Sequence, residues 1–114
     1  MTLTVSAYII EPNGDEKEIR LVSDLAGVES ARKEFYGSAL SISLGLKRLP
    51  QLREYAMLTF RGAELRDLLL EVETLIRAQP PGNGGDYYRF RLNNIKAAAE
   101  LAMEHGEAGV VYIG

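Results

Sequence analysis

Polar and apolar residues alternate along the first part of the chain, as they do in a β-strand that buries one face. The apolar positions of this alternation are Val5, Ala7, Ile9, Ile19 and Leu21. Between the two runs lies the segment 12–15, which contains Asn13-Gly14, and both residues tolerate the positive φ angles that hairpin turns need. The pattern therefore predicts a β-hairpin over residues 3–22.

The next two segments carry shorter patterns. Val28, Ala31 and Phe35 fall on one side of a helix over residues 24–36, and Gly37 ends it. Residues 38–50 fit two descriptions. Leucine and isoleucine alternate with serine and glycine as in a strand, yet a helix over the same residues has Ser38 as its cap. Lys47-Arg48 before Pro50 is typical of a helix end, so we favour the helix and keep the strand as an alternative.

The second half of the chain has a clearer periodicity. Residues 55–61 alternate as a strand, which Gly62 ends. Residues 63–79 keep the i, i+3, i+4, i+7 spacing of an amphipathic helix. The run of proline, glycine and asparagine at 80–85 then predicts an exposed loop, in which no P-loop signature is present. Asp86 is a candidate cap for the following helix.

Residues 87–114 predict a second amphipathic helix, a stop at Gly106 and a short apolar strand. A strand at this position belongs in the sheet. The order of elements indicates an α+β fold with an N-terminal β-hairpin, a largely antiparallel sheet with helices packed on one face, and a C-terminal strand in the sheet. We expect residues 1–114 to form a single domain.

Composition narrows the classes of function. The chain has 114 residues, of which 46% are hydrophobic and 25% are charged, and its net charge is −3. A negative net charge disfavours general binding of nucleic acid or of an acidic membrane surface, so we expect neither as a partner. The first 15 residues have no basic leader and no long apolar run, and we expect a cytoplasmic protein.

No residue pattern points to catalysis. The chain has no cysteine, and its single histidine, His105, lies at the predicted helix end beside Gly106. There a partly positive imidazole complements the helix dipole, and no second histidine is available for a metal site or a triad. We therefore expect a protein that is not an enzyme and binds no cofactor. A hydrolase that uses only carboxylates stays open, because carboxylates distant in sequence can converge in space.

Two groups of residues are candidates for partner binding. The first is an acidic stripe along the helix over 63–79, formed by Glu64, Asp67 and Glu71. Such a stripe can attract a basic partner through electrostatic steering. The alternative is a solvated helix face, on which acidic residues near the N-terminus are favoured by the dipole.

The second group is the aromatic and basic run over 86–91, with Tyr87, Arg89 and Arg91 as candidate contacts. Tyr and Arg together supply contact area and hydrogen bonds at interfaces, and interleaved aromatics can also stack on bases. The same run has a structural interpretation, because Tyr88 lies on the helix face that we expect to be buried. A smaller basic cluster, Lys47, Arg48 and Arg53, is expected to be solvated surface.

The second half of the chain shows a resemblance. RGAELRDLL at 61–69, followed by Glu71, is combined with RLNNI at 91–95 and a closing VYIG at 111–114. This combination resembles small stand-alone bacterial proteins of uncharacterised function, some of which are immunity proteins encoded beside polymorphic toxins. The resemblance implies a protein partner and assigns no functional residue.

Three hypotheses of function follow. The preferred one is a non-catalytic cytosolic protein-binding domain, in its specific form an immunity protein that neutralises a bacterial toxin. The second is a self-associating structural or regulatory module, for example a homodimer formed through an exposed sheet edge. The third is a small carboxylate hydrolase.

Overall fold

The predicted N-terminal hairpin is present in the computed structural model, which describes residues 2–114. Strand β1 (Thr2–Ile10) pairs antiparallel with β2 (Glu16–Ile19), and Ile10 lies opposite Glu16. In the turn, Gly14 has a φ angle of 91°. A residue without a Cβ adopts this conformation at no steric cost. The turn chemistry read from the sequence therefore fixes the register of the hairpin.

The single helix predicted over residues 24–36 is wrong. Residues 25–28 form strand β3 (Leu25–Val28), which pairs with the beginning of β1, and only the short π-helix η1 (Arg32–Tyr36) follows. Strand β2 covers β1 from Ala7 onward, so the first residues of β1 still have a free edge. The backbone of β3 finds its hydrogen-bond partners at that edge, and this outweighs a weak local helix pattern.

Residues 38–50 contain a helix, but a shorter one than we favoured. Helix α1 (Ala39–Ser43) begins where Ser38 Oγ accepts the backbone N–H of Ser41 at 3.2 Å. It ends before Gly45, whose φ angle is 88°. A second short helix, the 3-10 helix η2 (Leu49–Arg53), follows. The pair Lys47-Arg48 therefore connects two helices and does not end one.

The remaining elements follow the predicted order. They are β4 (Leu58–Arg61), α2 (Ala63–Ala78), α3 (Asn83–Met103), the 3-10 turn η3 (Gly106–Ala108) and β5 (Gly109–Ile113). Helix α3 begins earlier than expected, with Gly82 at its N-cap. Asp86 therefore lies inside the first turn and is not the cap.

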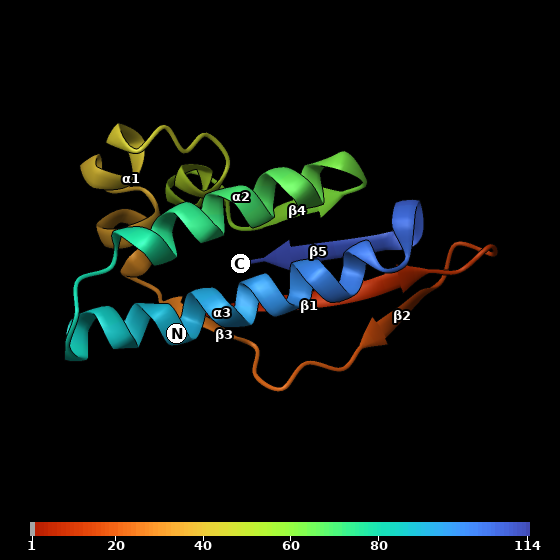
Figure 1. Ribbon diagram of the computed structural model, residues 1–114. Coiled ribbons are helices and arrows are strands. Elements are labelled where there is room, and N and C mark those ends of the chain that lie inside the picture. Colours follow the sequence, from red (N-terminus) through yellow and green to blue (C-terminus); the bar gives the residue numbers. More distant parts are fainter. Residues whose placement is uncertain (1) are drawn as a thin grey trace.

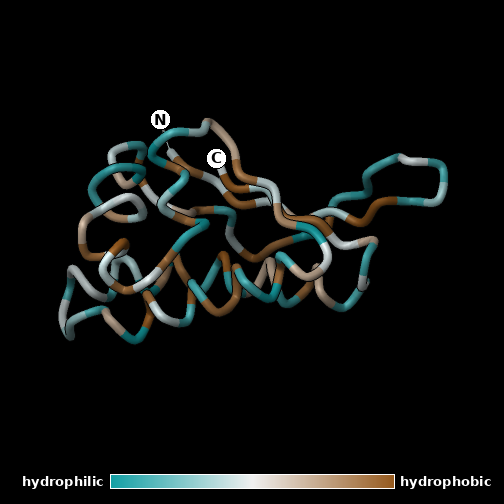
Figure 2. Tube along the Cα trace, turned by 90° about the horizontal axis from the view of Figure 1, so that it is seen from above, coloured by the Kyte–Doolittle hydropathy of each residue, from teal (hydrophilic) through white to brown (hydrophobic). Residues whose placement is uncertain are grey.

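The strands form one open antiparallel sheet in the order β2-β1-β5-β4, with β3 on the same side of β1 as β2. The C-terminal strand β5 is central, between β1 and β4. Helices α2 and α3 lie side by side across one face of the sheet, and the other face is uncovered (Figures 1 and 2). This is the predicted α+β arrangement, with the C-terminal strand in the sheet.

The core fills the space between the sheet and the two long helices. Strand residues on the inner face alternate with outer ones, and those fully buried there include Val5, Ala7, Val111 and Ile113. The helices contribute leucines and small residues to the same core, among them Leu68, Val72, Leu92, Ile95 and Ala99. No helix among residues 2–114 has the length and apolar character needed to cross a membrane.

Candidate binding surfaces

The acidic stripe of α2 faces the connection between α1 and η2. The carboxylate of Glu71 accepts the backbone N–H groups of Lys47 at 3.0 Å, Arg48 at 3.0 Å and Leu49 at 2.9 Å. These N–H groups lie at the start of η2, where a helix leaves donors without intrahelical partners. A carboxylate from another element satisfies them, and it carries the negative charge that a helix N-terminus favours.

The other two carboxylates of the stripe bind the side chain of Arg48. The guanidinium of Arg48 donates to Asp67 at 3.0 Å and to Glu64 at 3.4 Å. Glu64 also accepts the backbone N–H of Arg61 at 3.1 Å. Glu64, Asp67 and Glu71 therefore have internal partners, and they hold the segment 47–49 against α2. The sequence interpretation of Arg48 as solvated surface missed this pairing.

The aromatic and basic run at the start of α3 is also organised by internal contacts. The guanidinium of Arg91 lies 3.4 Å from the centre of the Tyr87 ring, as in a cation–π pair, and donates to the Tyr87 carbonyl at 3.1 Å. Arg89 pairs with Asp86 and donates to the carbonyl of Pro80 at 2.9 Å. Arg89 therefore ties the loop between α2 and α3 to the first turn of α3.

Tyr88 packs against the core, in agreement with its structural interpretation. Its ring stacks on Phe35 of η1, with centroids 3.7 Å apart and planes 3° apart. Burial, and next the neighbouring Tyr87, raise the pKa of Tyr88 above its ordinary value. Phe35 meets Tyr36 edge to face, so one row of aromatic rings joins η1 to α3.

The structure does not bring the two predicted groups together. Glu64 lies in the first turn of α2, whereas Arg89 contacts residues beyond its last turn. At 1.5 Å per residue, the 16 residues of α2 separate these ends by about 24 Å. A partner that touches both Glu64 and Arg89 must therefore span the length of this helix, whereas Glu71 lies near its middle.

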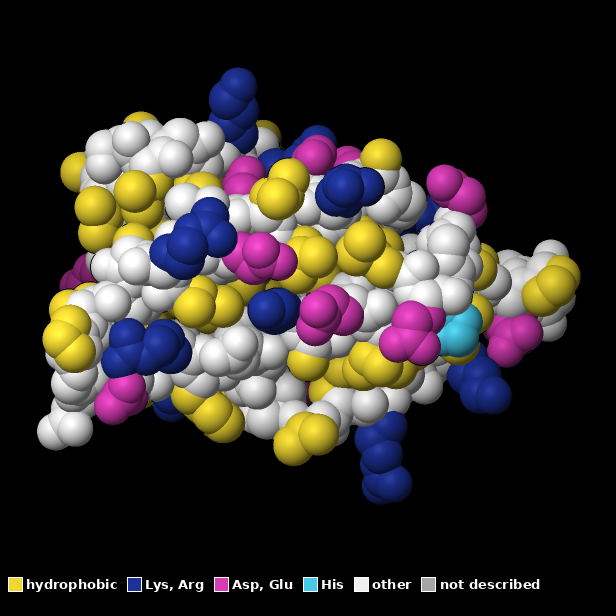
Figure 3. All heavy atoms as spheres, in the orientation of Figure 1, with side chains coloured by type: hydrophobic (Ala, Val, Ile, Leu, Met, Phe, Trp, Pro, Cys, Tyr) yellow, Lys and Arg dark blue, Asp and Glu magenta, His cyan; other side chains and the backbone are white. Residues whose placement is uncertain are grey.

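A surface that the sequence interpretation missed lies on α1. Leu40, Ile42 and Leu44 are 57%, 60% and 37% exposed, and we call these three residues the α1 patch. Hydrophobic side chains gather over this helix in Figure 3. The signal was present, because an alternating apolar pattern folded as a helix places successive apolar residues about 200° apart. Such residues cannot all face one core.

The uncovered face of the sheet carries hydroxyl and aromatic side chains. Tyr8 and Tyr112 meet edge to face with centroids 5.6 Å apart, and the Tyr112 hydroxyl donates to Glu16. That hydrogen bond, followed by partial burial, raises the pKa of Tyr112. Thr59 and Arg61 of β4 are exposed beside them, at the border of the sheet.

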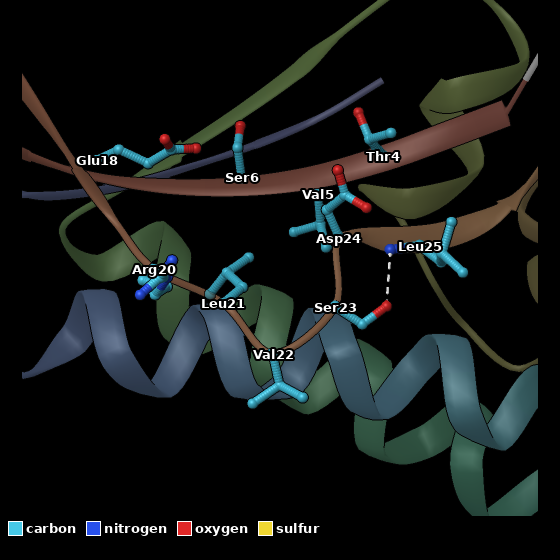
Figure 4. Close-up of a pocket in the computed structure, with 10 residues that line it drawn as sticks. All are labelled: Thr4, Val5, Ser6, Glu18, Arg20, Leu21, Val22, Ser23, Asp24 and Leu25. Atoms are coloured by element: carbon cyan, nitrogen blue, oxygen red, sulfur yellow. Dashed lines mark hydrogen bonds between the residues drawn. The ribbon is translucent and has the colours of Figure 1, made fainter.

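A hollow of about 610 Å³ lies where residues 20–24 leave the edge of β1 (Figure 4). In this view Thr4, Ser6 and Glu18 lie along the upper side of the hollow, away from α3, and Arg20 lies below Glu18, nearer to α3. Its charged side chains Glu18, Arg20 and Asp24 are all exposed. Water therefore screens them, and no charge is held in a fixed position for a ligand.

Among residues 2–114 no group of three or more His, Asp or Glu side chains is placed to hold a metal ion. No protein-family model matches the sequence, and comparisons with curated proteins and with solved structures give no match.

Proposed function

We propose that this protein is a binding domain whose function is to hold another protein, and that the α1 patch is its main contact surface. The observation that carries the proposal is the exposure of three large aliphatic side chains, two within the five-residue helix α1 and one, Leu44, at its C-cap. Exposed apolar side chains of this size, gathered around one short helix, are costly in water and are typical of interaction sites.

The patch is held in place, which favours binding. The hydroxyls of Ser38 and Ser41 both donate to the carbonyl of Phe35, at 2.8 Å and 2.7 Å. On the other side of α1, Glu71 fixes the segment that follows it. A surface already ordered in the free protein loses little conformational entropy when a partner docks. In this proposal the acidic stripe therefore supports the contact surface and does not itself meet the partner.

The specific form of the proposal is an immunity protein that neutralises a bacterial toxin. The resemblance of the second half of the chain to such proteins supports it. The partner then presents an apolar groove that encloses α1, because Leu40 and Ile42 lie on opposite sides of this helix.

The experiment begins with capture of a partner from a bacterial lysate by the tagged protein, followed by mass spectrometry. The affinity of the purified partner is then measured for the wild type, for Leu40→Ser/Ile42→Ser and for Val22→Ser by titration calorimetry. Val22 is fully exposed and outside the patch, so it serves as the control.

We expect the double variant to bind about a hundredfold more weakly and the control to bind as the wild type does, since buried apolar anchors dominate such interfaces. Equal affinities of all three proteins for the partner would show that the α1 patch is not the contact surface. Growth of cells that express the partner alone, and of cells that also express this protein, tests the toxin assignment. A partner that is harmless by itself contradicts it.

A further inference from the structure

Strand β4 forms one border of the sheet, and the backbone bonding on its inner side can be derived from β5. Thr4 and Gly114 exchange two backbone hydrogen bonds of 3.0 Å each. Along an antiparallel strand, the backbone groups of successive residues point to opposite sides of the strand. Gly114 bonds to β1, so the N–H and C=O groups of Ile113 and Val111 point to the side of β5 away from β1. That side is occupied by β4.

The outward groups of β4 follow from the same alternation. Leu58 lies opposite Ile113 and Phe60 opposite Val111, so these two residues bond inward to β5. Thr59 and Arg61 then point their backbone groups away from the sheet. The hydrogen bond from Arg61 N–H to Glu64 is independent evidence for this direction. The N–H and C=O groups of Thr59 therefore face outward at an open edge.

The two borders of the sheet differ in their protection. The β2 border carries Glu16, Lys17 and Glu18, three exposed charges in four residues, and β3 meets β1 with a register irregularity between Leu3 and Thr4. Charges and bulges at an edge are devices that prevent pairing with another chain. Strand β4 has a single charged residue, Arg61, at its end. It is the border that is left able to accept another strand.

We infer that β4 pairs antiparallel with β4 of a second copy of this chain, with the two-fold axis at Thr59. In this register Thr59 lies opposite Thr59 of the second copy and exchanges both backbone hydrogen bonds with it. Leu58 then lies opposite Phe60, and Met57 lies opposite Arg61. The strand is complementary to itself: apolar residues meet on the inner side, and the two arginines are not opposed.

The groove beside this edge fits the same arrangement. It has a volume of about 270 Å³ and is lined by Arg48 and Glu64 together with Tyr55 and Met57. Tyr55 and Met57 are both more than half exposed. A second copy covers these apolar side chains. The groove carries both a positive and a negative side chain, so two identical copies can approach each other here without repulsion between like charges. Pairing through a four-residue strand gives a weak dimer.

The test is sedimentation equilibrium of the full chain from about 10 µM to about 1 mM, the range suited to weak association. Three variants are compared with the wild type: Thr59→Lys, Thr59→Glu and Thr59→Pro. Thr2→Lys, at an exposed threonine of β1, is the matched control. Thr59→Pro removes an outward N–H, so it breaks no bond to β5.

We expect the wild type and Thr2→Lys to dimerise with the same dissociation constant. Thr59→Pro should weaken dimerisation tenfold or more, because both symmetry-related N–H donors are lost, which is about 1.4 kcal/mol or more. Thr59→Lys and Thr59→Glu place like charges opposite each other and should each dissociate more readily than the wild type. An equimolar mixture of the two should restore a dimer that contains one copy of each.

Amide hydrogen exchange supplies a second measurement. Thr59 N–H should become protected as the protein concentration rises, while Phe60 N–H, which bonds to β5, is protected at every concentration. A wild type that stays monomeric up to about 1 mM overturns the inference, as does a dimer that all three Thr59 variants leave unchanged. The inference is independent of the proposed function, because the Thr59 variants leave the α1 patch intact.

Discussion

The carboxylate of Glu71 accepts the backbone N–H of Arg48 at 3.0 Å, while the Arg48 side chain reaches the carboxylate of Asp67, one turn earlier on the same helix, at 3.0 Å. One residue is therefore held to α2 at both its backbone and its side chain. Through it, the α2 helix positions the short helices on either side, including the one that carries the α1 patch.

We predict that Glu71→Gln lowers the free energy of unfolding by about 2 kcal/mol, because an amide has one acceptor oxygen where the carboxylate has two. Glu73→Gln on the same helix is the control, since no hydrogen bond of its side chain is found in the part of the chain described. Urea titration followed by circular dichroism gives both values. Equal midpoints for the two variants would show that the 47–49 segment does not depend on this carboxylate.

The second prediction concerns the buried hydroxyl of Tyr36 and its contribution to stability. It donates to the carbonyl of Ala26 at 2.6 Å, and the residue has no exposed surface. Tyr36→Phe should cost about 1–2 kcal/mol of stability, because the Ala26 carbonyl is left buried without this donor. Thermal unfolding of Tyr36→Phe and of Tyr55→Phe, an exposed tyrosine, separates this loss from a general effect of removing a hydroxyl.

Tyr36 also links stability to alkaline pH. Burial raises the pKa of Tyr36 well above its ordinary value of 10.0, so above that pH the unfolded chain releases a proton that the folded protein retains. The stabilisation by this group is complete below pH 10 and is lost as the pH rises further. Unfolding free energy measured from pH 8 to pH 11 should fall less steeply for Tyr36→Phe, with the remaining slope supplied by Tyr88 and Tyr112. Parallel curves for the variant and the wild type would contradict the prediction.

Two glycines should respond to alanine in opposite directions. A Cβ at Gly109 meets the carbonyl oxygen of Ala102 at 1.9 Å, so Gly109→Ala must separate β5 from the end of α3. We expect a loss of about 3 kcal/mol, typical of severe overpacking. Gly84 lies in the first turn of α3 with nothing within 4 Å of a Cβ, and Gly84→Ala should gain about 0.5–1 kcal/mol of helix propensity. Denaturant midpoints of the two variants on either side of the wild type would confirm both.

The sequence predicted best where a local pattern and its tertiary partners agree. Helix α2 has an apolar stripe long enough to lie on the sheet, and the hairpin carries its own turn residues, so the boundaries of both were close to the observed ones. Residues 24–36 lacked that agreement. Their helical pattern rested on Val28, Ala31 and Phe35 alone. The free edge of β1 provides hydrogen-bond partners for the backbone of β3, and these partners cannot be predicted from the sequence of residues 24–36 itself.

The candidate site residues show the same difference between what the local pattern predicts and what tertiary contacts decide. Spacing correctly placed Glu64, Asp67 and Glu71 on one side of α2, and it correctly assigned Tyr88 a structural role. Spacing does not identify what faces a helix. The segment 47–49 lies 15 or more positions earlier in the chain, and its contact with the stripe depends on how α1 and η2 fold back over α2.

The sequence alone therefore determined the α+β class, the hairpin, the two long helices and the closing strand, because these follow from periodicities of 2 and 3.6 residues and from turn chemistry. Tertiary structure alone decided which border of the sheet stays open, which apolar side chains stay exposed on α1, and which charges are neutralised within the fold. These properties depend on contacts between segments that are distant in sequence. Loop closure brings such segments together, and the local pattern of polar and apolar residues does not indicate which segments will meet.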